Sequence, residues 1–92
     1  MIIEKKPKYL LHLLSILKYI ATDKPSAAQK FEKELEQKLS NLILFPLQYK
    51  ASFYIPSENY RDMVFEGYTI IYKVKTDKII IIDIFKWQNP SF

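Results

Sequence analysis

The run Lys-Ile-Ile-Ile-Ile-Asp-Ile-Phe at residues 78–85 constrains the fold of this chain more than any other segment. Four consecutive isoleucines offer no polar side to water, so the run predicts a strand covered on both faces. Strand alternation places Asp83 on one face with Ile81 and Phe85. A carboxylate inside such a strand is costly unless it is paired, so we expect Asp83 to form a structural pair with a cation. A catalytic role is less favoured, because no His or second carboxylate is positioned to share the work.

The N-terminal residues predict a short strand followed by a helix. Ile2 and Ile3 favour a strand, and Pro7 suits the first turn of a helix, where its missing N–H removes no hydrogen bond. Residues 9–21 are almost entirely apolar. A helix this apolar is expected to be covered on more than one side. Its few polar residues lie on one narrow stripe, formed by Lys8, His12, Ser15 and Thr22.

A second helix is predicted to follow after a connection of only a few residues. Asp23 or Ser26 is expected to cap its N-terminus, Pro25 to lie in its first turn and Pro46 to end it. Its apolar residues fall on one face and its charged residues on the others, which is typical of an amphipathic helix. The two helices should therefore form an antiparallel hairpin. The apolar face consists of Ala28, Phe31, Leu35, Leu39 and Leu42.

After Pro46 the hydrophobic period changes to that of strands. Gly67, the single glycine of the sequence, lies where a tight hairpin needs a positive φ. The order of elements predicts an α+β fold in one domain, residues 1–92. We expect an N-terminal strand and an antiparallel helical hairpin packed on one face of a small twisted antiparallel sheet. The strands predicted after Pro46 are residues 49–55, where the signal is weak, 60–66, 68–75 and 78–87.

Composition excludes several classes of protein. The chain has 92 residues, no cysteine and a net charge of +4, and 13 of its 14 cations are lysine. One small domain without disulfides or thiolate zinc sites follows. No stretch reaches the length of about 18 apolar residues that crosses a bilayer, and we recognise no signal peptide. The cytoplasm is therefore the expected location.

Few residues are suited to chemistry. One glycine cannot build a phosphate-binding loop, and one histidine without cysteine makes a metal or cofactor site unexpected. His12 is interpreted as a surface or boundary histidine. Arg61, the single arginine, suggests a site that needs a planar fork, either for an internal carboxylate such as Asp83 or for a partner. Both interpretations stay open. Lysines lie among aromatic residues on the predicted strands, a pattern found both in nucleic-acid surfaces and in ordinary solvated sheet faces.

Four segments together resemble the RelE/ParE superfamily, the toxins of bacterial type II toxin–antitoxin pairs. The resemblance covers nearly the whole chain and is strongest to the ParE branch. It implies a small antiparallel sheet with a helical hairpin packed on it. The segments are YIATDKPSAAQKFEKEL (19–35), LFP (44–46), YRDMVFEGYTIIYKV (60–74) and IIIIDIFKWQNP (79–90).

The two branches act on different targets. RelE-like members cut messenger RNA on the ribosome with basic residues and a C-terminal Tyr or His, whereas ParE-like members inhibit DNA gyrase. By this resemblance Arg61 matches a basic position at the start of the middle strand. Met63 and Thr69 stand at two further basic positions of the RelE type, and Lys86 and Trp87 stand near the C-terminal catalytic position. The resemblance therefore favours a ParE-like gyrase inhibitor over an enzyme.

The expected function is that of the toxin in a plasmid stabilisation, or addiction, module, neutralised by a cognate antitoxin. Such antitoxins are acidic and fold as they wrap the toxin, which suits a toxin with a charge of +4. Two alternatives are a ribosome-dependent ribonuclease centred on Arg61 and Lys86, and a non-toxic relic that only binds its antitoxin. The candidate working residues are Arg61, Lys86, Trp87 and Gln88.

Overall fold

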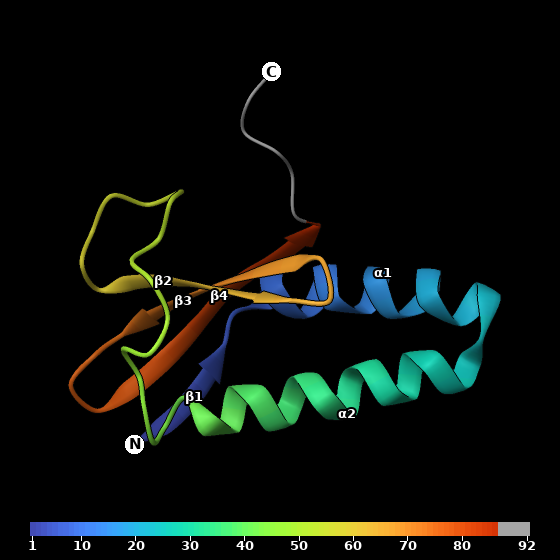
Figure 1. Cartoon of the computed structure of the whole chain (residues 1–92), viewed down its shortest axis with the longest axis horizontal. Coiled ribbons are helices and arrows are strands. Elements are labelled where there is room, and N and C mark those ends of the chain that lie inside the picture. The colour runs from blue at the N-terminus through green and yellow to red at the C-terminus, as the bar shows by residue number, and fades with distance from the viewer. Residues whose placement is uncertain (87–92) are drawn as a thin grey trace.

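Four strands form one mixed sheet, and two helices pack against one of its faces (Figure 1). The computed structural model describes residues 1–86. The strand order is β1-β4-β3-β2, in which β2, β3 and β4 are antiparallel and β1 runs parallel to β4. The predicted α+β fold is confirmed, but the N-terminal strand makes the sheet mixed rather than antiparallel throughout. The elements are β1 (Ile2–Lys5), α1 (Pro7–Asp23), α2 (Pro25–Asn41), β2 (Tyr60–Phe65), β3 (Tyr68–Val74) and β4 (Lys78–Lys86).

The isoleucine strand β4 lies inside the sheet and is covered on both faces, as predicted. Ile79, Ile81 and Ile84 are almost completely buried in the core shared with the helices. On the opposite face Ile80 is 7% exposed, and Phe85 is in contact with the segment between α2 and β2. In this segment the ring of Tyr54 packs edge-on against Phe85, with the ring centroids 5.0 Å apart.

A bulge in β4 overturns the predicted alternation around Asp83. Ile81 pairs with Tyr72, but Asp83 pairs with Ile71, so β4 contains one residue more than β3 at this point. Because Tyr72 and Ile71 lie on opposite faces of β3, Asp83 and Ile81 also lie on opposite faces. The prediction that they share a face is therefore wrong.

Both helices begin at a proline, as predicted from Pro7 and Pro25. The predicted cap of α2 is wrong, because Asp23 is the last residue of α1 and Lys24 occupies the N-cap position without a side-chain hydrogen bond. Pro46 is not adjacent to the end of α2, which ends at Asn41. Within residues 1–86, neither helix combines the length and the apolarity needed to cross a bilayer.

Helix α1 packs against both α2 and β4, but residues 1–86 leave part of its apolar surface uncovered, which the sequence did not lead us to expect. Its residues Tyr9 and Leu13 are buried. Leu10, Leu11 and Leu14 are 48%, 64% and 50% exposed, respectively. We call these three residues the leucine face. Figure 1 shows that the end of the hairpin where α1 meets α2 projects beyond the sheet.

Residues 49–55 do not form the predicted strand. They make one isolated antiparallel bridge, between Ala51 and Arg61. The N–H of Ser52 donates to the carbonyl of Tyr60 at 2.8 Å, but the N–H of Phe53 donates to a carboxylate oxygen of Asp62, also at 2.8 Å. A side chain thus takes a backbone donor at this point, and the ladder ends after one bridge.

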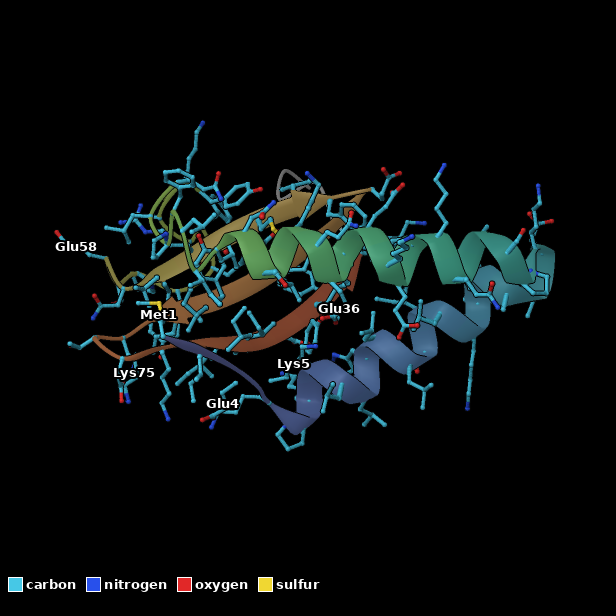
Figure 2. All side chains as sticks on the ribbon, turned by 90° about the horizontal axis from the view of Figure 1, so that it is seen from below. Met1, Glu4, Lys5, Glu36, Glu58 and Lys75 are labelled. Atoms are coloured by element: carbon cyan, nitrogen blue, oxygen red, sulfur yellow. The ribbon has the colours of Figure 1, made fainter. Side chains whose placement is uncertain are left out.

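An ion pair joins the edge of the sheet to α2. The ammonium of Lys5 lies 2.7 and 2.8 Å from the two carboxylate oxygens of Glu36. Figure 2 shows the two side chains approaching each other from β1 and α2. Both groups are partly exposed, so we expect this pair to contribute at most about 1 kcal/mol to stability.

Candidate functional site

The C-terminal half of β4 has an edge that no strand within residues 1–86 covers. Strand β1 pairs only with Lys78–Ile81 of β4. The chain then turns away, as the N–H of Lys6 donates to the carbonyl of Ile81 at 3.0 Å and α1 begins at Pro7. Helix α1 therefore continues alongside β4 where β1 stops, and the polar stripe of α1 meets this edge.

Asp83 is paired, as predicted, but its partners come from α1. Its Oδ1 atom lies 2.6 Å from Nδ1 of His12 and accepts the N–H of Ile84 at 2.8 Å. Its Oδ2 atom lies 3.5 Å from the ammonium of Lys8. An ionised carboxylate only accepts hydrogen bonds, so Nδ1 of His12 is the donor and Nε2 is the ring nitrogen left for other contacts.

A cavity of about 410 Å³ lies between α1 and β4 and opens to solvent. Its volume falls in the range of about 300–1,000 Å³ that is typical of small-molecule sites. Apolar side chains dominate its lining, and we call it the α1–β4 cleft. It is lined by His12, Ser15, Ile16, Tyr19, Tyr68, Ile84, Phe85 and Lys86.

Arg61 serves the fold at the opposite end of the sheet. Its Nη1 donates to the carbonyl of Tyr49 at 3.0 Å, which fixes the long segment between α2 and β2. Arg61 pairs with Tyr72 in the sheet register. The hydroxyl of Tyr72 donates to the carbonyl of Pro46 at 2.8 Å in the same segment. Of the two interpretations left open for Arg61, the structure gives it an internal acceptor, which is a carbonyl and not Asp83.

The structure does not bring Arg61 and Lys86 together. Arg61 pairs with Tyr72 of β3, whereas Lys86 pairs with Tyr68. Four residues of strand separate these two positions, a distance of about 13 Å. Trp87 and Gln88, the other two candidates, lie outside the described residues.

Sequence reasoning missed His12 as part of a cluster. The stripe Lys8, His12 and Ser15 was visible in the sequence, but its partner Asp83 lies in the last strand. The bulge that changes the face on which Asp83 lies has no signal in four isoleucines. Residues 1–86 contain no group of three or more His, Asp or Glu side chains suited to a metal ion.

The fold and its exposed apolar surface define a small two-layer α+β protein with three half-exposed leucines on α1. The family described as "ParE toxin of type II toxin-antitoxin system, parDE" matches residues 3–88, and the chain belongs to this family. A chain from the chromosomal ParDE toxin–antitoxin system of P. aeruginosa has the same fold, with a TM-score of 0.76 and 20% sequence identity. The match covers 96% of this chain and 97% of that one. A search of curated protein sequences finds no significant match.

Proposed function

We propose that this chain inhibits DNA gyrase as the toxin of its pair and is neutralised by direct binding of a cognate antitoxin. Membership of the ParE toxin family carries the proposal. The separation of Arg61 from Lys86 supports inhibition by binding rather than RNA cleavage centred on these two cations, because one site cannot use both of them.

The leucine face supports a protein partner. Three neighbouring leucines that are about half exposed form an apolar patch on a helix, and such patches on small proteins mark interaction sites. A helix or strand of the antitoxin bound to this face would bury them. The net charge of +4 favours an acidic partner.

We assign the contact with gyrase to the end of β4, at Lys86 and the following Trp87 and Gln88. Lys86 is exposed and forms no ion pair with another residue in 1–86. Its ammonium is therefore available to a partner, unlike the guanidinium of Arg61, which already donates to a backbone carbonyl.

The test is a supercoiling assay with purified gyrase, run in parallel with an assay of ribosome-bound messenger RNA. We expect inhibition of supercoiling, relief by the antitoxin and intact RNA. Leu11→Ser should weaken relief by the antitoxin and leave inhibition of gyrase unchanged. Cleaved RNA with unaffected gyrase would refute the proposal, as would normal growth of cells that accumulate the folded chain without antitoxin.

A further inference from the structure

The α1–β4 cleft has the features of a ligand site that neither the family nor the proposed function assigns. It exists because β1 stops at Lys5, so that within residues 1–86 the C-terminal half of β4 has a strand neighbour, β3, on one edge only. Helix α1 continues along this edge but does not fill it, which leaves a cavity of about 410 Å³.

The floor and walls of the cleft favour an apolar ligand. Ile16 and Ile84 contribute aliphatic surface, and Phe85 contributes a ring. Tyr19 and Tyr68 add two rings with polar tips. Apolar walls with a few polar groups are typical of sites that bind small organic molecules.

The charge available in the cleft is positive. Asp83, the nearby carboxylate, is already engaged by His12, by Lys8 and by the N–H of Ile84. Lys86 also lines the cleft and has no ionic partner within residues 1–86. An apolar ligand that carries one negative charge would satisfy both the walls and this ammonium.

The bulge in β4 keeps the cleft open to such a ligand. On the C-terminal side of the bulge the carboxylate of Asp83 contacts His12 and accepts the N–H of Ile84, a backbone donor of the strand. A strand that extended β1 along this edge would have to displace this hydrogen bond. Asp83 thus protects this edge from pairing with another strand. The space beside Phe85 and Lys86 remains unfilled by residues 1–86.

We propose that the α1–β4 cleft binds an apolar group that carries a carboxylate, with the apolar group against Ile16, Ile84 and Phe85 and the carboxylate at Lys86. This chemistry can come from a small organic acid or from an acidic residue that neighbours an apolar one in the antitoxin. The proposal does not depend on inhibition of gyrase.

The test is titration of the full chain with 2-naphthoate, followed by calorimetry or by amide chemical shifts. 2-Naphthamide, which has the same shape without the charge, serves as the ligand control. We expect naphthoate to bind about fivefold more tightly than naphthamide, and Lys86→Gln to remove this preference. Lys75→Gln, at an exposed lysine in the β3–β4 turn, is the matched protein control and should keep it.

A second variant tests the position of the site. Ser15 is an exposed residue that lines the cleft, so Ser15→Phe should fill the cleft, abolish binding of naphthoate and preserve the fold. Equal binding of naphthoate and naphthamide, or undiminished binding to folded Ser15→Phe, overturns the proposal.

Titration of the toxin–antitoxin complex with naphthoate separates the two sources of the carboxylate, a small organic acid and the antitoxin. Retained binding identifies a small acid as the ligand, and lost binding identifies the antitoxin carboxylate.

Discussion

The imidazole of His12 lies against the carboxylate of Asp83, with Nδ1 2.6 Å from Oδ1, although the two residues are 71 positions apart in the sequence. This contact joins α1 to β4 immediately after the β4 bulge. It also determines which polar groups of the α1–β4 cleft remain free. The His12–Asp83 contact therefore connects the stability of the fold with the chemistry of the cleft.

Asp83→Ala should destabilise the protein by about 1–3 kcal/mol, because the buried N–H of Ile84 and the ring of His12 both lose an acceptor. His12→Ala should cost less, since Ile84 keeps its acceptor. In a double-mutant cycle followed by urea unfolding, we expect a coupling free energy of about 0.5 kcal/mol or more. Additive effects of the two substitutions would show that the contact contributes nothing to stability.

The location of this pair shows what sequence could and could not predict. The burial of the isoleucines and the need of Asp83 for a partner followed from hydrophobicity and the cost of burying charge. The identity of the partner did not follow, because a single inserted residue in β4 changes the face on which Asp83 lies. Tertiary geometry of this kind leaves no periodic signal.

The loop and the first helix show a second limit of sequence reasoning. The alternation in residues 49–55 predicted a strand, but Asp62 takes the N–H of Phe53 and the ladder stops at Ala51. The apolar composition of α1 predicted cover on several sides, but the leucine face is exposed. Apolar composition alone does not tell whether a helix surface is buried within the fold or left exposed.

The turn between β2 and β3 should respond in opposite directions to two substitutions. Glu66 and Gly67 both have positive φ, 51° and 81°. This is the geometry of a type I′ hairpin turn, which favours Asn-Gly. Glu66→Asn should raise the midpoint of urea unfolding and increase the free energy of unfolding by up to about 1 kcal/mol. Gly67→Ala should lower stability by about 1–2 kcal/mol through backbone strain alone, since an added Cβ has no atom within 4 Å. A change in stability of the same sign for both substitutions would contradict the assignment of a type I′ turn.

Removal of the hydroxyl should have different effects on stability at two buried tyrosines. The hydroxyl of Tyr72 donates to the carbonyl of Pro46 at 2.8 Å, whereas the buried hydroxyl of Tyr9 has no hydrogen-bond partner within residues 1–86. Tyr72→Phe should therefore destabilise the protein by about 1 kcal/mol. Tyr9→Phe should be neutral or stabilising, because it removes a desolvated polar group without breaking a bond. Thermal unfolding of the two variants gives the comparison, and a larger loss for Tyr9→Phe would contradict it.

Alkaline pH should destabilise the fold through the same tyrosine. Burial raises the pKa of Tyr72 from its ordinary value of 10.0 to about 12. The folded state thus holds the proton more tightly than the unfolded state. The resulting stability is complete below pH 10 and is lost as the pH rises through 12, to a total of about 2–3 kcal/mol. Unfolding measured between pH 9 and about pH 12 should show a steeper decline for the wild type than for Tyr72→Phe. Parallel declines would exclude Tyr72 as the cause.

Substitution of Lys86 should reduce inhibition of gyrase, whereas substitution of Arg61 should reduce the stability of the fold. Lys86 is exposed at the end of β4, so Lys86→Gln should leave the free energy of unfolding within about 0.5 kcal/mol of the wild type and reduce inhibition of gyrase. Arg61 donates to the carbonyl of Tyr49, so Arg61→Met should cost about 1–3 kcal/mol of stability because that acceptor loses a charged donor.

The decisive measurement is the amount of gyrase inhibition per folded molecule, at a temperature where both variants are native. Under these conditions Arg61→Met should inhibit like the wild type, since the arginine side chain is committed to the loop and its position is displaced from that of Lys86 by about 13 Å along the strands and by two strands across the sheet. Lys75→Gln controls for the loss of one positive charge. A folded Arg61→Met chain that no longer inhibits gyrase would place Arg61 in the contact with gyrase and remove the distinction between the two cations.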